Sequence, residues 1–168
     1  MRASGLPFLR SEMTPEIQIT CDGSSLGNGQ VVETRAACAA LMTDSVHWRA
    51  VGEYLGSLTN QQAELMAAAL ALEALRFPSQ VTLRSDSAYL IRTMRGEFQR
   101  KTNHEFWQRL DRAAERHQVT WLWTRGHAGD PVQTLCDRAA RSIAAAPSTC
   151  EATLQFILRE ARALRFQH

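Results

Sequence analysis

The chain lacks several features that would assign it to a particular class of protein. Its four cysteines form no Cys-x-x-Cys pair and no histidine stands at zinc-ligand spacing, so we expect reduced cysteines in a cytoplasmic protein. No apolar run approaches the roughly 18 residues that cross a bilayer, which predicts no membrane association. The net charge is only +2, so bulk charge predicts no nucleic-acid partner. Internal repeats and low-complexity linkers are also missing.

The composition suits one ordinary globular domain. The 168 residues are 45% hydrophobic and 21% charged, which is enough to bury a core without disulfides. Residues 1–15 hold only a short, proline-interrupted apolar stretch, too short for a signal peptide, and we expect a disordered leader there. The patterns that follow predict one domain over residues 16–146 and an amphipathic helix over residues 147–168.

The first half of the domain is predicted to begin with three strands. Apolar and polar residues alternate over residues 17–21, which indicates a strand, and Asp22-Gly23 is a turn signal that would end it. We therefore expect Asp22 at the end of a strand. Segments 36–42 and 46–55, separated by Thr43-Asp44-Ser45, are predicted to continue as an antiparallel meander.

A helix over residues 60–76 is the clearest element, because Leu65, Ala68 and Leu72 form an apolar stripe at helical spacing. Glu64 falls near its start. A strand over 81–85 and a short helix over 87–94 follow, which places Asp86 at their junction. In open α/β sheets, ligands bind beyond the carboxyl ends of such strands.

The second half alternates in the same way. Residues 103–117 are predicted to form a helix with Phe106 and Leu110 inward, 119–123 a strand, and 132–145 a helix that carries Asp137. A last helix has one apolar stripe. We expect this stripe to pack against its own domain in a monomer, the alternative being a contact with a second copy or a partner.

Four acidic residues stand in distinctive local segments. These segments are Thr20-Cys-Asp22-Gly-Ser-Ser-Leu-Gly-Asn28, Thr59-Asn-Gln-Gln-Ala-Glu64, Ser85-Asp86-Ser-Ala-Tyr89, and Gly126-His127-Ala-Gly-Asp-Pro131 with Cys136-Asp137. Taken singly, each acid has a structural explanation: Asp22 as a turn residue, Glu64 as a first-turn helix acid, Asp86 as an N-cap, and Asp137 as an ion-pair partner of Arg141.

Together and in this order, the four segments resemble type 1 ribonuclease H over roughly residues 16–146. The resemblance implies an α/β protein of the ribonuclease H-like fold, with a mixed five-stranded sheet flanked by helices. It also implies a metal-dependent endonuclease that hydrolyses the RNA strand of RNA/DNA hybrids, leaving 5′-phosphate and 3′-hydroxyl ends. Four clustered carboxylates would repel one another without divalent cations, and oxygen ligands of this kind suit Mg²⁺ or Mn²⁺.

The resemblance assigns roles to individual residues. Asp22 would bridge two metal ions, Glu64 and Asp86 would help to hold one, and Asp137 the other. His127 matches the family's catalytic histidine, which assists proton transfer or product departure. The positions that match substrate contacts are Gly23, Ser24, Asn28, Thr59, Asn60, Gln61 and Gln133.

Some positions depart from the family's pattern. Gln61 and Gln133 stand where asparagine is usual, and residues 95–104 replace a longer basic protrusion that grips the DNA strand in many bacterial members. We therefore expect weaker hybrid binding. The rival hypotheses are a hybrid-binding module with little or no catalysis, and a domain that serves a reverse transcriptase.

Overall fold

The computed structural model describes residues 14–27, 33–126 and 129–164. The strands are Glu16–Leu26 (β1), Arg35–Thr43 (β2), Trp48–Gly56 (β3), Gln80–Ser85 (β4) and Gln118–Trp123 (β5). The helices are Asn60–Glu73 (α1), Ala88–Met94 (α2), His104–Glu115 (α3), Pro131–Ala145 (α4) and Cys150–Leu164 (α5), with a 3₁₀ turn, Pro147–Thr149 (η1), before α5. The predicted leader over residues 1–15 lies almost wholly outside the described residues.

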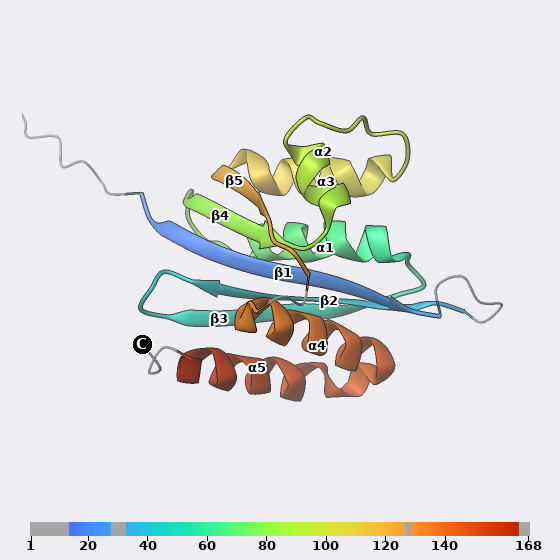
Figure 1. The fold of residues 1–168 in the computed structure, drawn as a ribbon, viewed down its shortest axis with the longest axis vertical. Coiled ribbons are helices and arrows are strands. Elements are labelled where there is room, and N and C mark those ends of the chain that lie inside the picture. Colours follow the sequence, from blue (N-terminus) through green and yellow to red (C-terminus); the bar gives the residue numbers. More distant parts are fainter. Residues whose placement is uncertain (1–13, 28–32, 127–128, 165–168) are drawn as a thin grey trace, which may run out of the picture.

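The strands form one mixed sheet in the order β3-β2-β1-β4-β5. β1, β2 and β3 pair antiparallel as a meander, whereas β4 pairs parallel with both β1 and β5. Helices α1, α2 and α3 lie on one side of the sheet, and α4 and α5 on the other (Figure 1). The predicted mixed five-stranded sheet flanked by helices is confirmed.

β2 is the most enclosed strand, since every residue from Ala36 to Met42 is buried. Its side chains alternate between two cores: Cys38 and Ala40 face the core under α1 and α3, while Ala39 and Leu41 face the core under α4 and α5. Small side chains let the helices on both faces approach the sheet closely, and this brings α1 and α4 near β1.

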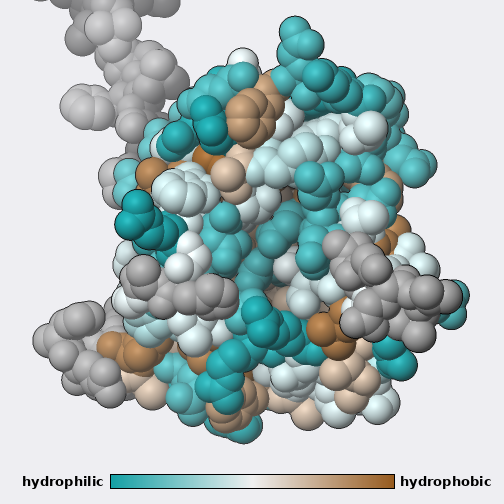
Figure 2. Space-filling view, turned by 45° about the vertical axis from the view of Figure 1, so that its right-hand side comes forward, coloured by the Kyte–Doolittle hydropathy of each residue, from teal (hydrophilic) through white to brown (hydrophobic). Residues whose placement is uncertain are grey.

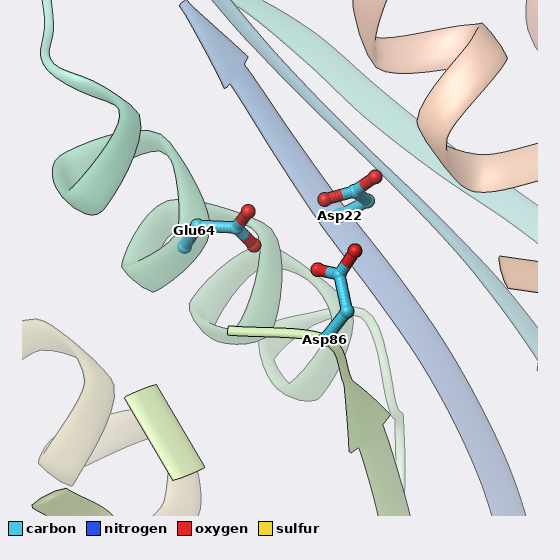
Figure 3. Close-up of side chains that lie close together, drawn as sticks. All are labelled: Asp22, Glu64 and Asp86. Atoms are coloured by element: carbon cyan, nitrogen blue, oxygen red, sulfur yellow. The ribbon is translucent and has the colours of Figure 1, made fainter. Parts of the chain in front are cut away.

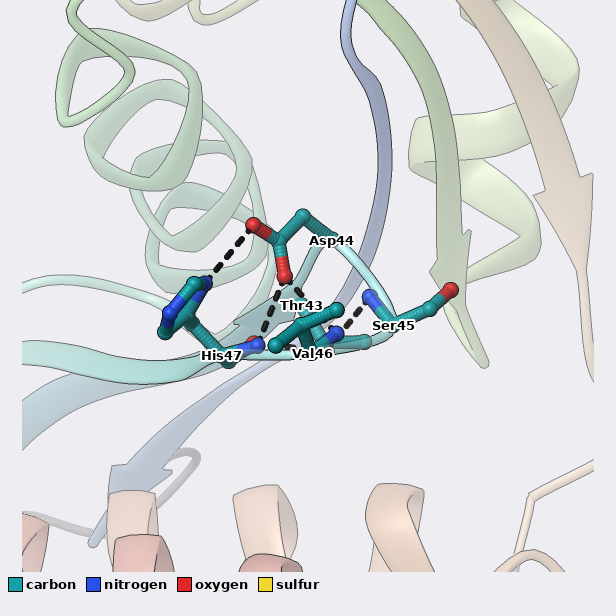
Figure 4. A network of polar contacts seen from close by, with 5 residues as sticks. All are labelled: Thr43, Asp44, Ser45, Val46 and His47. Carbon is teal, nitrogen blue, oxygen red and sulfur yellow. Dashed lines mark hydrogen bonds and ion pairs between the residues drawn. The ribbon is translucent and has the colours of Figure 1, made fainter.

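The β2–β3 hairpin turns where the sequence predicts, at Thr43-Asp44-Ser45. The Asp44 Oδ1 atom accepts hydrogen bonds from the backbone N–H groups of Val46 (2.8 Å) and His47 (2.6 Å), and its Oδ2 atom lies 3.0 Å from His47 Nδ1 (Figure 4). These contacts hold the pKa of Asp44 well below its usual range. Ser45 takes a positive φ of 81°, which closes the turn.

The predicted helices are present, with differences in detail. α1 ends at Glu73 rather than residue 76. In α3, Phe106 and Leu110 face the core as predicted, with Phe106 half-buried, and Trp107 is buried as well. In α5, Ile157 and Ala161 are buried against α4 and β2, so the last helix packs on its own chain.

None of the helices in the described ranges is both long and apolar enough to span a membrane. The face drawn in Figure 2 is mostly hydrophilic or of intermediate hydropathy, and its apolar side chains lie in small separate groups. Among the residues that the structure describes, the exposed large apolar side chains are Leu26, Val46, Phe77, Phe98, Trp123 and Phe156.

Candidate active site

Asp22 lies in the middle of β1, not at its end. It pairs with Ala39 of β2, and the strand continues to Leu26, so the turn predicted at Asp22-Gly23 is wrong. A Cβ atom on Gly23 would come within 2.3 Å of the backbone carbon of Ala63 in α1. Glycine is therefore required here because α1 crosses β1 in close contact, and this packing overrides the local turn preference.

Glu64 projects from α1 toward this point of β1. It stands in the second turn of α1, beyond the first-turn position considered in the sequence, and its Oε2 atom accepts a hydrogen bond from the Gly23 backbone N–H at 3.2 Å. Asp86 follows β4 directly, as predicted, but the N-cap of α2 is Ser87. The structural explanations for Glu64 and Asp86 are therefore wrong.

The carboxylates of Asp22, Glu64 and Asp86 converge from a strand, a helix and a bend (Figure 3). One oxygen atom from each lies within 4.8 Å of the others. Burial raises the pKa of Asp22 to about 8, and the charge of Asp86 adds to the rise. Burial and the charge of Asp22 likewise raise the pKa of Glu64 well above its usual range. Without a counterion, Asp22 and Glu64 therefore resist ionisation.

Asp137 lies beside this cluster on α4. Its carboxylate is near enough to raise the pKa of Asp22, yet it is outside the group of three mutually close acids. Its Oδ1 atom accepts a hydrogen bond from Arg141 Nε at 3.1 Å, as the structural alternative predicted. The ion pair uses one carboxylate oxygen of a partly exposed residue, so it does not by itself exclude a ligand role for Asp137.

The donor set fits a hard divalent cation. All donors are carboxylate oxygens, which suit such ions, and a bound cation would offset the repulsion that raises the pKa of Asp22. A cluster of this kind is costly in folding, because buried carboxylates lose hydration without an opposite charge. The presence of three converging carboxylates around the buried Asp22 therefore argues for binding of a metal.

Several predicted substrate-binding residues have partners within the protein. Thr59 is the N-cap of α1, where it forms a capping box with Gln62. Asn60 Oδ1 accepts a hydrogen bond from the Ser25 backbone N–H at 2.7 Å, which ties the start of α1 to β1. Gln133 is only 3% exposed and its Nε2 donates to the Cys21 carbonyl oxygen at 3.2 Å.

The other predicted contacts vary in accessibility. Ser24 is buried, and Gln61 is exposed on the first turn of α1. Asn28 and His127 lie outside the described residues. Asp130, in the same loop as His127, is the N-cap of α4 and accepts hydrogen bonds from the backbone N–H groups of Val132 and Gln133.

The short α2–α3 connection is folded onto the body of the protein. Arg92 pairs with Glu97 and stacks over Phe98. Arg100 pairs with Asp111 and stacks over Trp107. Since these guanidinium groups are already engaged, the connection presents fewer uncommitted cations than its sequence indicates.

Two residues contact Asp86 in the structure, and neither contact was indicated by the sequence. The Trp123 indole N–H donates to the Asp86 carbonyl oxygen at 3.1 Å, and Gly126 lies against the Asp86 carboxylate. Trp123 had only a strand pattern to mark it, and nothing in the sequence connected it with Asp86. Gly126 was quoted in the histidine segment, but without a role.

Comparisons with known proteins identify the family of the chain. The RNase H family model matches residues 14–145. A ribonuclease H of Proteus mirabilis (strain HI4320) is 35% identical over 149 residues, covering 81% of this chain and 91% of that protein. The structure of LC9-RNase H1, a type 1 RNase H with the type 2 active-site motif, aligns with a TM-score of 0.68 at 24% identity, covering 84% of this chain and 75% of that one.

A second structure, LC11-RNase H1 in complex with an RNA/DNA hybrid, aligns with a TM-score of 0.61 at 20% identity, covering 75% of this chain and 97% of that one. At such identities the two structures show a shared fold. The family model spans most of the chain and includes the four acids, and the Proteus mirabilis relative is similar over nearly its whole length. The chain therefore belongs to the RNase H family.

Proposed function

We propose that the protein is a metal-dependent endonuclease that hydrolyses the RNA strand of RNA/DNA hybrids. The observation that carries the proposal is the convergence of Asp22, Glu64 and Asp86, with ligand oxygens within 4.8 Å of one another, in a member of the RNase H family. LC11-RNase H1, which shares the fold, was solved with an RNA/DNA hybrid, and this supports a hybrid as the substrate.

The four acids would bind two metal ions between them. Two divalent ions held there would activate the attacking water and stabilise the leaving oxygen of the phosphodiester. Asp22 suits the bridging position, because its carboxylate interacts with Glu64 and Asp86 and also with Asp137. Glu64 and Asp86 would complete one side of the site and Asp137 the other, giving 5′-phosphate and 3′-hydroxyl products.

His127 would assist proton transfer or product departure. The proposal rests on its segment, Gly126-His127-Ala-Gly129, and on the ordinary pKa of histidine, which lies near neutral pH. Because His127 lies outside the described residues, its distance from the acids plays no part in the proposal.

The hybrid would be recognised mainly at the start of α1 and along β1. Thr59, Asn60 and Gln61 lie exposed at that helix end, where backbone N–H groups and the helix dipole favour a phosphate. Gly23, Ser24 and Asn28 would face the minor groove, in which 2′-hydroxyls distinguish RNA from DNA. Gln133 would act from a buried position, by fixing β1 at Cys21.

We further propose Mg²⁺ as the metal, with Mn²⁺ as a substitute, because both accept oxygen ligands together with water and substrate phosphate. A cytoplasmic, monomeric enzyme is supported by the free state of the four cysteines and by the packing of α5 against its own chain.

The test is cleavage of a hybrid labelled on its RNA strand, with Mg²⁺ or Mn²⁺, beside single-stranded RNA and DNA duplex. We expect cleavage of the hybrid alone, lost by at least about a hundredfold in Asp86→Asn because one metal ligand is weakened. The matched control is Asp111→Asn, the same change in a half-exposed acid that pairs with Arg100. Folded protein that binds the hybrid with either metal and cuts nothing would overturn the proposal in favour of a binding module.

A further inference from the structure

Asp86 differs from the other two clustered acids in how its backbone is held. Asp22 lies within the β1–β2 ladder and Glu64 within α1, so regular hydrogen bonds fix both. Asp86 occupies a bend between the last residue of β4, Ser85, and the N-cap of α2, Ser87. Its position therefore depends on contacts from other parts of the chain.

The end of β5 supplies such contacts. Ser85 and Trp123 are the last paired residues of the parallel β4–β5 ladder. Immediately beyond, the Thr124 backbone N–H donates to the Ser85 carbonyl oxygen at 3.0 Å, and Trp123 Nε1 donates to the Asp86 carbonyl oxygen at 3.1 Å. The ladder is thus extended by one side-chain hydrogen bond that reaches the residue carrying the carboxylate.

Burial does not account for a tryptophan at position 123. Trp123 is 43% exposed. Trp107, by comparison, is 1% exposed, and its indole nitrogen is buried without a hydrogen-bond partner. Trp107 thus contributes mainly apolar packing. Trp123 contributes a directional hydrogen bond, since an indole N–H is a donor and has no other polar function.

The same segment also limits the Asp86 side chain. A Cβ atom on Gly126 would lie 3.1 Å from Asp86 Oδ2, closer than ordinary van der Waals contact. A side chain at residue 126 would therefore push the carboxylate by a few tenths of an ångström, and glycine avoids this displacement. Trp123 holds the backbone of Asp86, and Gly126 leaves space for its carboxylate.

We infer that Trp123 is a positioning residue, which holds Asp86 at the distance from Asp22 and Glu64 that metal binding requires. Gly126 serves the same end by leaving space for the carboxylate. The inference deepens the proposed function and rests on it. Groups that orient metal ligands without touching the metal commonly change affinity or activity by about 10- to 100-fold when they are removed.

The decisive variant is Trp123→Phe, which keeps an aromatic ring and removes the indole N–H. Its matched control is Trp121→Phe, the same substitution two residues earlier in β5, on the same face of the strand. No hydrogen bond involves the Trp121 indole in the described part of the chain, and its ring packs against the core under α1 and α3. Gly126→Ala is a second, independent variant, because its added methyl group would press on the Asp86 carboxylate.

Three measurements separate positioning from general loss of structure: Mn²⁺ affinity of the metal-free protein by calorimetry, thermal unfolding in EDTA, and kcat and KM on the hybrid. We expect Trp123→Phe and Gly126→Ala to bind Mn²⁺ about tenfold more weakly than wild type. Their kcat should fall at limiting Mn²⁺ and recover at high Mn²⁺, with KM for the hybrid unchanged. Trp121→Phe should lose thermal stability and keep wild-type Mn²⁺ affinity.

Equal Mn²⁺ affinity in Trp123→Phe and Trp121→Phe would overturn the inference. The two proposals fail in different ways. If the wild-type protein binds Mn²⁺ and cuts no hybrid, the proposed function fails, while the calorimetric comparison still decides whether Trp123 positions Asp86.

Discussion

Asp22 is 3% exposed and is surrounded by other carboxyl groups, so its charge is unfavourable in the metal-free protein. Its pKa is about 8 in the folded state and about 3.9 in an unfolded chain. The folded state therefore holds a proton that the unfolded state releases. This contribution to stability is fully present below pH about 4 and is lost as the pH rises through about 8.

We accordingly predict that the Tm of the wild-type protein in EDTA falls as the pH rises from 5 to 9, because Asp22 and Glu64 are forced to ionise in a buried site. Asp22→Asn should have the higher Tm at pH 9 and a flatter profile, since asparagine carries no charge. Differential scanning calorimetry across this range checks both points. A variant whose Tm declines as steeply as that of the wild type would contradict the expected role of Asp22.

At the residue scale, the sequence predicted the chemistry of Asp22 better than its geometry. Asp-Gly is a turn signal in isolation, but here Gly23 is needed for the close approach of α1, and the strand runs on. Only the three-dimensional packing distinguishes these two uses of glycine. The contact between Trp123 and Asp86 was unpredictable for the same reason, because 37 residues separate its partners.

At the scale of elements, the start of α1 combines two functions in one residue. Thr59 caps the helix through a capping box with Gln62, and it is also a proposed contact for a phosphate of the substrate. A cap requires a side-chain oxygen at this position. A phosphate contact requires that the position not be negatively charged. A substitution that satisfies the first condition and violates the second separates the two functions.

We predict that the free energy of unfolding of Thr59→Asp lies within about 0.5 kcal/mol of the wild-type value, because aspartate is a good N-cap and its charge interacts favourably with the helix dipole. Its KM for the hybrid should rise on the order of tenfold, equivalent to about 1.4 kcal/mol, by repulsion of phosphate. Urea unfolding and steady-state kinetics provide the two readouts. Thr59→Ala is the control, expected to lose about 1 kcal/mol of stability. A Thr59→Asp enzyme with wild-type KM would leave Thr59 as a cap alone.

The α2–α3 connection shows what element prediction misses. Helical spacing identified α3 and its inward-facing Phe106, which packs against the core, but missed Trp107, the fully buried residue one position along. The spacing of apolar residues locates the buried face of a helix to within about one residue. The elements packed against the helix determine which side chains on that face are buried. Likewise, the sequence shows arginines at positions 92 and 100, but their pairing with Glu97 and Asp111 depends on the folded path of the connection.

At the scale of the whole molecule, α5 extends the fold beyond the region that the RNase H family model matches. That region ends at residue 145, and α5 begins at Cys150. α5 lies beside α4, the helix that carries Asp137, and packs with it on β3 and β2 of the sheet. The buried side chains of α5 therefore stabilise the fold. No residue of α5 belongs to the acidic cluster.

Two neighbouring residues of α5 test whether it stabilises this chain or serves an interface. Ile157 is 1% exposed in the α4–α5 core, whereas Phe156 is 38% exposed beside Arg138. We predict that Ile157→Ala loses about 3 kcal/mol of unfolding free energy, with kcat and KM unchanged at temperatures where it is folded. Phe156→Ala should lose less than about 1 kcal/mol and sediment as a monomer, like the wild type. If Phe156→Ala instead lowers the molecular mass from that of a dimer, the exposed side of α5 is an interface between two copies, and the helix serves assembly as well as stability.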